Sequence, residues 1–467
     1  MKTRASDDTR ETFALSGSTR VAKAIHAELP DMEHTLAEFV AGPRTRDDAV
    51  RLRARILLAD AFVLSVAANE VSGLGSVLEL GAGTGAHLSW ATGRRLGAAD
   101  AVQANSTAIN ARFQDDTDMS TWSHPGSFVI PGAVAAVVER DGTLGDLIDA
   151  LISGYATTVW LGGQGEVAHA MKQRGFRPSP VFGPLGAAAA VSRGLGLDAE
   201  ATRHALNAAA LIGRGTLRSV GGGGDDWRLH APGAARDGFL IALAAQRGMR
   251  AAELGLTGNH GFLDVITGDR QAPASWSEAP RDELISEVWQ KALPIVGDDM
   301  SVALAAQHLH GQIGTGNITG IRVHMNADYA AFPGTQVRPP YRSVTAAQAS
   351  VRFSTAHLLR HGRLSMRDLE TERNDPATAR LAEMVDVIAD PSIDYTDALV
   401  EVDVAGRTHR CRTTDLPKTL FWRDVSTQMA VADELLGARG RKLVSAVIET
   451  GEATRVGALL ETLFGKA

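Results

Sequence analysis

Apolar residues recur every three or four positions along much of the chain, which is the spacing of helices that bury one face. The strongest example is the range 46–69, where Leu52, Ile56 and Leu64 fall near one face. The same spacing predicts further helices over the ranges 19–40, 127–139, 143–161, 166–174, 182–195, 198–211 and 230–248. The chain up to about residue 275 is therefore predicted to form a large all-helical domain.

The pattern changes after a stretch rich in Pro, Ser and charge at 272–280, which is a candidate domain boundary. Residues 281–312 predict two helices around Leu293-Pro294. Beyond them, apolar and polar residues alternate over 318–325 as in a strand, with Ile321, Val323 and Met325 on one face.

A second strand signal comes near the end of the chain. The ranges 398–403 and 407–413 predict a pair of strands joined at Ala405-Gly406. Residues 423–464 are again helical in pattern. The predicted fold is mainly α: a helical domain over 1–275, to which 415–467 return, and a smaller α+β domain over 276–414.

Two glycine-rich stretches interrupt the helical pattern. The sequence from Ser76 to Gly85 matches the first motif of S-adenosylmethionine-dependent methyltransferases, but helix after helix follows instead of alternating strands and helices. We therefore favour a connecting segment and keep a methyltransferase as an alternative. The second stretch, 213–226, contains four consecutive glycines, Gly221–Gly224, and predicts a mobile loop that is a candidate lid.

Composition and charge exclude several classes of function. Hydrophobic residues make up 44% of the 467 residues and aromatic residues only 5%, so small side chains must provide much of the core. The net charge of −7 gives no basic surface for nucleic acid. The N-terminus is polar and no run of about 18 apolar residues occurs, so we expect no signal peptide, no membrane span and a cytoplasmic protein.

The sequence gives no expectation of a metal or a cofactor. Cys411 is the single cysteine, which rules out an intrachain disulfide and a cysteine-based metal cluster. We find no His-x-x-x-His spacing on a clearly predicted helix. His308 and His310 are two residues apart, and such residues point in different directions on a helix.

The candidate chemistry is concentrated in residues 105–133. Asp115, Asp116, Thr117 and Asp118 lie within ten residues of His124, which precedes an apolar, Ala-rich helix. Carboxylates, a hydroxyl and an imidazole beside a helix N-terminus suit proton transfer, because the helix dipole favours a neutral histidine base. The alternative is a capped turn, since Asp and Thr cap helices and His-Pro-Gly breaks them.

The stretch resembles the signature of the MmgE/PrpD family, the 2-methylcitrate dehydratase-like proteins. Chains of that family read approximately Asp-Phe-Asp-Asp-Thr and then His-Pro-Ser or His-Pro-Gly before an Ala-rich helix. Here Asp115-Asp116-Thr117 and His124-Pro125-Gly126 match those positions. The resemblance implies a helical domain with an α+β domain, a small-molecule substrate, no cofactor and a homodimer.

Other motifs of the family are present with changed polar residues. The resemblance places Phe113 where relatives have an Asp, Arg177 for a His, Trp227 for a Lys and Phe353 for a Tyr. Thr117, His124 and Lys291 are retained. The frame of the family is thus kept while an acid, a base, a cation and a phenol are replaced, which predicts altered chemistry in a more aromatic pocket.

The leading hypothesis is a cofactor-independent lyase or isomerase that removes a proton next to a carbonyl or carboxylate, by dehydration, isomerisation, decarboxylation or cyclisation. The candidate catalytic residues are His124, Asp116, Thr117 and Lys291. The candidate substrate-binding residues are Phe113, Asp115, Arg177, Trp227, Arg228, His230 and Phe353. The alternatives are a non-catalytic ligand-binding protein on the same fold and the methyltransferase.

Overall fold

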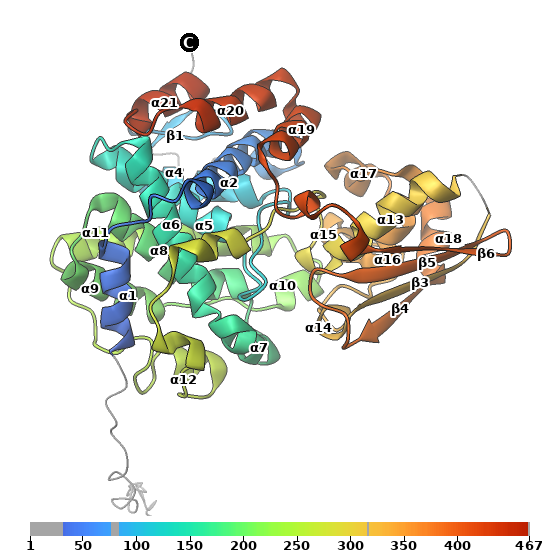
Figure 1. Ribbon diagram of the computed structural model, residues 1–467, viewed down its shortest axis with the longest axis horizontal. Helices are drawn as coiled ribbons and strands as arrows, with labels where there is room; N and C mark the ends of the chain where they lie inside the picture. Colours follow the sequence, from blue (N-terminus) through green and yellow to red (C-terminus); the bar gives the residue numbers. More distant parts are fainter. Residues whose placement is uncertain (1–30, 76–83, 315–316, 466–467) are drawn as a thin grey trace, which may run out of the picture.

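The structure is a computed structural model that describes residues 31–75, 84–314 and 317–465. Within them the chain is mostly helical, with one four-stranded sheet at one side (Figure 1). This confirms the prediction of a mainly α protein with a smaller α+β part. The longer helices before residue 275 are α1 (Met32–Ala41), α2 (Asp48–Ala67), α4 (Ala98–Asn110), α5 (Pro125–Glu139), α6 (Leu144–Leu161), α7 (Glu166–Gln173), α8 (Pro178–Leu195), α9 (Ala199–Ala210), α11 (His230–Gln246) and α12 (Phe262–Thr267).

Helix α8 is the centre of this helical part, and it packs against α5, α6, α9 and α11. Small residues let these helices approach closely. A Cβ atom on Gly154 of α6 would lie 2.7 Å from the Cβ of Ala190 on α8, so only glycine fits at that crossing. The scarcity of aromatic residues is thus matched by helices packed through alanine and glycine.

Three helices from the end of the chain cover the helical part: α19 (Val425–Leu436), α20 (Ala438–Glu449) and α21 (Val456–Phe464) (Figure 1). Helix α20 packs on α2, where Leu443 joins the buried cluster that contains Phe62. Arg51 of α2 forms ion pairs with Glu452 at 2.7 Å and with Asp149 at 2.8 Å. The limits of the domains at residues 275 and 414 stay a prediction.

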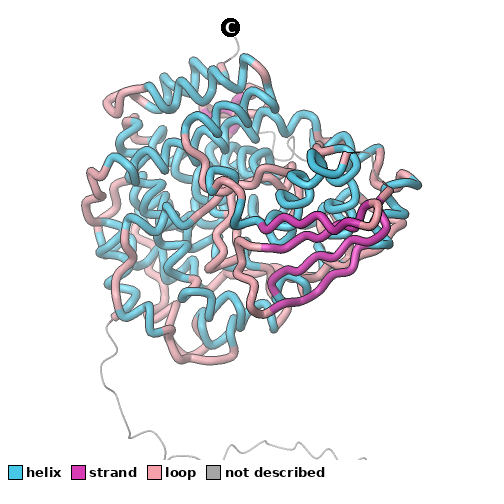
Figure 2. Tube along the Cα trace, turned by 45° about the vertical axis from the view of Figure 1, so that its right-hand side comes forward, coloured by secondary structure: helices cyan, strands magenta, loops and turns pink. Residues whose placement is uncertain are grey.

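The sheet has the strand order β4-β3-β5-β6, with β3 (Ile318–Asn326), β4 (Val385–Asp390), β5 (Ala398–Val404) and β6 (Arg407–Arg412). Strand β3 runs parallel to β4 and antiparallel to β5. Ile321, Val323 and Met325 are buried, as predicted, because helices cover that face of the sheet (Figure 2). The covering helices are α13 (Met300–Ile313), α16 (Val351–His361) and α18 (Pro376–Met384).

The β5–β6 hairpin was predicted from its turn residues, and the structure confirms it. Ala405 and Gly406 both have positive φ, of 49° and 77°, which is the conformation of a tight two-residue hairpin turn. Short helices α14 (Ala327–Ala330), α15 (Val344–Gln348) and α17 (Met366–Thr371) complete the part of the chain around the sheet.

The predicted helix before Leu293-Pro294 is wrong. Residues Asp282–Glu287 form a 3₁₀ turn, and the α-helix begins only at Met300. Trp289 lies between them in extended backbone, where its N–H donates to the Thr117 carbonyl at 2.9 Å and its carbonyl accepts from Thr117 N–H at 2.7 Å. This long-range pairing holds the segment against the residue 113–124 loop and replaces the helical hydrogen bonds.

The glycine-rich loop differs in part from the prediction. A short helix, α10 (Arg218–Gly221), ends at the first of the four glycines, so a glycine does close a helix there. The Gly223 carbonyl accepts a hydrogen bond from the Ser343 hydroxyl at 2.8 Å, and this bond fastens the loop to α15. A lid function for this loop stays a prediction.

Part of the sequence prediction lies outside the described residues. Residues 19–30 of the first predicted helix and Ser76–Gly83 of the methyltransferase-like motif belong to that part. From Thr84 onward the chain forms a two-stranded hairpin, β1 (His87–Leu88) with β2 (Arg95–Leu96), and then helices. Among the described helices, none is both long and apolar enough to cross a membrane.

Candidate functional site

His124 occupies the N-cap position of α5, immediately before Pro125. Its Nδ1 lies 3.0 Å from the backbone carbonyl oxygen of Asp116 and 3.2 Å from the Thr117 hydroxyl. A carbonyl oxygen can only accept, so we assign the proton to Nδ1, which donates to Asp116. The Nε2 atom, which has no hydrogen bond within the described residues, then carries the free lone pair.

The backbone around His124 is fixed on both sides. The His124 N–H donates to the Ser179 hydroxyl at 3.2 Å, and the His124 carbonyl accepts from the Ser127 hydroxyl at 2.7 Å. On the preceding loop, the Asp118 carboxylate accepts from the N–H and hydroxyl groups of Ser120 and Thr121. The imidazole is thus held by a loop whose polar groups are internally bonded.

Two buried cations set the charge state of His124. Burial lowers the pKa of His124 well below its usual value, and the charges of Lys291 and Arg177 lower it further. The imidazole is therefore neutral near pH 7, as a general base requires. The position at the helix N-terminus agrees with the sequence prediction of a neutral base.

The carboxylate of Asp116 faces away from the imidazole. Its Oδ1 accepts from the backbone N–H of Gly126 at 2.8 Å, and its Oδ2 accepts from the Tyr155 hydroxyl at 2.5 Å. Burial raises the pKa of Asp116 to about 7. Asp116 therefore positions His124 through its backbone carbonyl, while its side chain ties the start of α5 to α6.

Substitution of Gly126 by alanine tests this anchor. A Cβ atom there would lie 2.8 Å and 2.9 Å from the two Asp116 carboxylate oxygens and 2.9 Å from the Tyr155 hydroxyl. We expect Gly126→Ala to lower the free energy of unfolding by about 1–3 kcal/mol, measured by urea denaturation. Gly457 is the matched control, since it is also the second residue of a helix but has open space around it. Gly457→Ala should leave stability unchanged or raise it, and an equal loss in both variants would contradict the anchor.

Lys291 and Asp115 form a pair that is fully buried, with 3.7 Å between Lys291 Nζ and Asp115 Oδ1. The Asp115 Oδ2 accepts from the side-chain amide of Asn110 at 2.7 Å, whereas Lys291 Nζ and Asp115 Oδ1 have no hydrogen-bond partner in the described part of the chain. Burial lowers the pKa of Lys291 to about 8 and raises the pKa of Asp115. Lys291 Nζ also lies 4.7 Å from the centre of the Phe113 ring.

Arg177 is the second buried cation beside His124. Its Nη1 donates to the Trp227 carbonyl at 2.9 Å, and its Nη2 has no hydrogen-bond partner among the described residues. Burial lowers its pKa to about 10, so the guanidinium remains charged near pH 7. A buried guanidinium with an unused donor is suited to bind a carboxylate.

Phe113 and Trp227 form the apolar side of the site. Their ring centres are 4.4 Å apart, and the Phe113 ring lies 5.6 Å from the His124 ring. Trp227 is fully buried and donates from Nε1 to the Thr345 hydroxyl at 3.0 Å. Phe113 lines the cavity and Trp227 packs behind it, while a site more aromatic than that of relatives stays a prediction.

A small cavity of about 30 Å³ lies at these residues, and its lining includes Phe113, Thr117, His124, Arg177, Val296 and Phe332. A much larger cleft of about 920 Å³ adjoins it. Met119 and Trp122 belong to the lining of both, so these two side chains form the wall between cavity and cleft. A cavity of this volume is large enough for about one or two water molecules.

Five of the seven predicted substrate-binding residues do not line the cavity: Asp115 and Trp227 lie buried behind it, and Arg228, His230 and Phe353 lie elsewhere. Arg228 donates to the Ala111 carbonyl and is turned from the cavity because residues 226–229 form a 3₁₀ turn. His230 is half-buried, with its Nε2 3.9 Å from the Asp226 carboxylate. Phe353 contacts Tyr341 and His357 in the core behind the sheet, so its predicted contact with a substrate is not supported by its position.

Several residues that hold the site in place could not be identified from the sequence. Tyr155, Asn110 and Thr345 bond to Asp116, Asp115 and Trp227. Tyr155 lies within an apolar helix and Thr345 on a short helix far along the chain, so neither had a local signal. Ser179 lies two residues after Arg177, in the stretch Gly175-Phe-Arg-Pro-Ser179 that resembles a family motif, and this was the available signal for it.

Comparison with known proteins gives two matches. Residues 34–275 match the family model described as the MmgE/PrpD N-terminal domain. The chain is also 28% identical to cis-aconitate decarboxylase of Homo sapiens over 248 residues, which are 51% of this chain and 47% of that protein. The chain thus spans about half the length of this curated relative. His124, Asp116, Thr117 and Arg177 lie within the family match, whereas Lys291 and Phe353 lie outside it.

Proposed function

Since the chain belongs to the MmgE/PrpD family, we propose that it is a cofactor-independent lyase or isomerase that removes a proton next to a carbonyl or carboxylate. The observation that carries the proposal is the state of His124. Its Nδ1 donates to the Asp116 carbonyl, its Nε2 has no hydrogen bond to any residue that the structure describes, and burial beside two cations keeps it neutral. An imidazole in this state accepts a proton at Nε2 near pH 7.

The two buried cations, Lys291 and Arg177, support the same reaction by stabilising negative charge on the substrate. Removal of a proton next to a carboxylate places negative charge on the carboxylate oxygens, and fixed positive charge in a buried site stabilises that charge. In the proposal, Arg177 binds the substrate carboxylate through its unused Nη2 donor. Lys291 does not line the cavity but lies behind the Phe113 ring, and it contributes its positive charge from there. Thr117 helps to orient His124 through its hydroxyl.

The lining favours a substrate with an apolar part. Phe113, Val220, Val296 and Phe332 offer apolar surface at the cavity, while the acid and the lysine implied by the family resemblance are absent at Phe113 and Trp227. We therefore propose that 2-methylcitrate and cis-aconitate are poor substrates. Because the cavity measures only about 30 Å³, we propose that a substrate needs more room there, which movement of Met119 and Trp122 toward the adjoining cleft would provide.

The test is a panel of carboxylates that includes 2-methylcitrate, cis-aconitate and aromatic acids, followed by mass spectrometry. Loss of water, loss of carbon dioxide, or unchanged mass with a shifted retention time would identify dehydration, decarboxylation or isomerisation. Exchange of a substrate C–H for deuterium in heavy water would report proton abstraction without net reaction. Robust turnover of 2-methylcitrate or cis-aconitate would show that the proposed preference is wrong.

Arg177→Gln tests the proposed carboxylate contact. Loss of a hydrogen bond from a charged donor is worth about 1.5–3 kcal/mol, which corresponds to a decrease in kcat/KM of about 10- to 150-fold. If the contact is equally strong in the bound state and in the transition state, most of this loss should come from a higher KM, with kcat nearly unchanged. Arg177→Lys keeps the charge and should recover part of the activity. Equal activity in wild type and Arg177→Gln would remove Arg177 from the proposal.

A non-catalytic binding protein is the second candidate, favoured by the small cavity and by the polar residues of the family that are replaced at Phe113 and Arg177. It would bind a ligand tightly without turnover, and calorimetry with the same panel would detect it. Binding without any product or deuterium exchange would support this candidate over the enzyme.

A further inference from the structure

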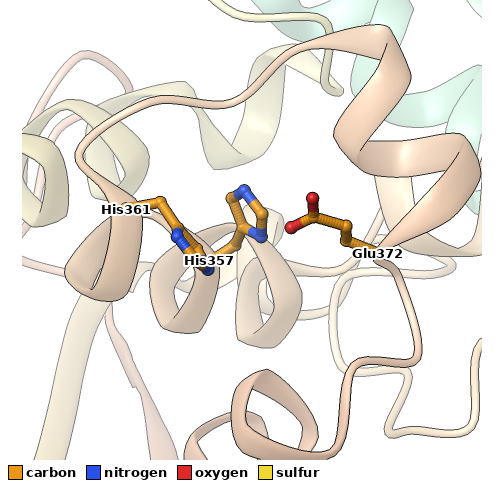
Figure 3. Close-up of side chains that lie close together, drawn as sticks. All are labelled: His357, His361 and Glu372. Carbon is orange, nitrogen blue, oxygen red and sulfur yellow. The ribbon is translucent and has the colours of Figure 1, made fainter.

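Two histidines and a glutamate come together at the end of α16, away from the His124 cavity (Figure 3). His357 and His361 lie one turn apart on α16, with ring centres separated by 4.5 Å. Glu372 follows directly after α17, and Figure 3 shows its carboxylate directed at the His357 ring. One nitrogen or oxygen atom from each residue lies within 4.8 Å of the others.

These donor atoms have no other use within the described residues. The His357 side chain is 1% exposed, and its Nδ1 has no hydrogen-bond partner there. The Glu372 carboxylate and the His361 ring likewise have no hydrogen bond or ion pair in the part of the chain that the structure describes. Buried polar nitrogens are normally hydrogen-bonded. A buried, unbonded His357 Nδ1 close to a second imidazole and a carboxylate therefore indicates a missing ligand.

The nearby acid, Asp368, is already occupied. It lies 3.9 Å from His357 Nε2, but its Oδ2 accepts from the backbone N–H and the hydroxyl of Ser365 at 2.8 Å each, and it pairs with Arg363 at 3.4 Å. Asp368 therefore completes the capping box of α17, in which Ser365 is the N-cap residue. Glu372 is the carboxylate left to face the two histidines.

We propose that His357, His361 and Glu372 bind a divalent transition-metal cation such as Zn²⁺. Histidines four residues apart on a helix present both imidazoles on one face, and two imidazoles with a carboxylate are a common ligand set for zinc. Zinc–nitrogen and zinc–oxygen bonds of about 2.0–2.2 Å require the three ligand atoms to approach by small rotations of the side chains. Water fills the fourth position.

The structural role of this cation would be to join two helices. His357 and His361 belong to α16, and Glu372 follows α17, so the cation would hold the end of α17 against α16. This link would add to the capping box that fixes the start of α17 at Ser365. None of the three residues lines the His124 cavity. The site is therefore separate from the proposed chemistry and is expected to act on stability.

The spacing corrects an expectation from the sequence. His357-Leu-Leu-Arg-His361 is a His-x-x-x-His pair, and α16 carries both residues, so the expectation that no such pair lies on a helix is wrong. The reason is that residues 351–361 mix polar and apolar side chains without a strong helical stripe. Their helix is stabilised by packing against α13 and α18.

The experiment uses the full chain without a histidine tag, stripped by a chelator and titrated with Zn²⁺ in a calorimeter. Wild type is expected to bind one Zn²⁺ per chain at this site, and His361→Ala and Glu372→Gln should each weaken it at least about tenfold. His308→Ala is the matched control, since His308 is an exposed histidine on the neighbouring helix α13. It should bind Zn²⁺ like wild type.

A second measurement keeps the test decisive if His361→Ala folds poorly. The melting temperature of wild type should rise with Zn²⁺, because a ligand that binds only the folded state stabilises it, and Glu372→Gln should lose this rise. No binding by wild type would overturn the proposal. Equal affinity in wild type and Glu372→Gln would also overturn it, since the cation would then be bound elsewhere.

Discussion

Replacement of His124 by alanine is expected to lower kcat by about 10²- to 10⁴-fold, which is the usual contribution of one positioned general base. The loss follows from the geometry, since Nε2 has no hydrogen bond within the described residues and the imidazole is held by Asp116 and Thr117. The measurement is the rate of product formation, or of deuterium exchange, on the best substrate of the panel. His308→Ala, far from the cavity, is the control for loss of a histidine.

The stability of the variant separates chemistry from folding. His124→Ala removes the Nδ1 donor of the buried Asp116 carbonyl, so it should lower the free energy of unfolding by about 1–3 kcal/mol while the protein remains folded and binds substrate. Unchanged turnover in a folded His124→Ala protein would remove the proposed mechanism. Unchanged turnover together with unchanged binding would also exclude a ligand-positioning role.

The same residues predict the pH dependence of kcat/KM. Since the pKa of His124 lies well below 6.5, protonation should not reduce activity until the pH falls below that value. Above about pH 8, Lys291 loses its charge, so activity should decrease on the alkaline side. Asp116, whose pKa is about 7, could add an acid limb of its own, and Asp116→Asn would remove it. An acid limb at or above 6.5 that persists in Asp116→Asn would contradict the assignment of His124 as the base.

Lys291→Met is expected to lower the free energy of unfolding by about 3–5 kcal/mol, because it leaves the buried Asp115 carboxylate without its cation. Both side chains are fully buried, and Asp115 Oδ1 has no other partner among the described residues. The measurement is urea denaturation at pH 7, where Lys291 is charged.

The double variant Asp115→Asn with Lys291→Met is the control. An asparagine can still accept the bond from Asn110, and no charge is left buried, so most of the stability should return. Activity should stay low in the double variant if the Lys291 charge supports catalysis. A single variant as stable as wild type would show that this pair contributes little to folding.

The fold was predictable where local sequence decides it. Thr143 and Asp146 form a capping box at the start of α6, and Ala405-Gly406 makes its hairpin turn from residues that tolerate positive φ. Strand β4 was missed because its residues do not alternate in burial and its partner, β3, lies about sixty residues earlier in the chain. The range that contains Trp289 was predicted as helix because the local sequence pattern carries no sign of its backbone pairing with the distant Thr117.

The candidate site shows the same limit. His124 and Thr117 could be found because they lie close together in sequence within a recognisable motif. The family resemblance also indicated Lys291. The structure places its Nζ 3.7 Å from Asp115 Oδ1, although the two residues lie far apart in the sequence. Phe353 could not be placed in this way, since a one-residue difference in helical phase decides whether a ring faces the cavity or the core.

The packing of α20 on α2 has a consequence for the order in which the protein can fold during synthesis. Helix α2 exits the ribosome early, yet Leu443 of α20 and the ion pair of Arg51 with Glu452 complete its surroundings only when nearly all of the chain has been made. Contacts between such distant segments close slowly. While the sheet is being translated, α2 therefore lacks the apolar cover that α20 gives it in the folded protein, and such exposed apolar surface favours aggregation.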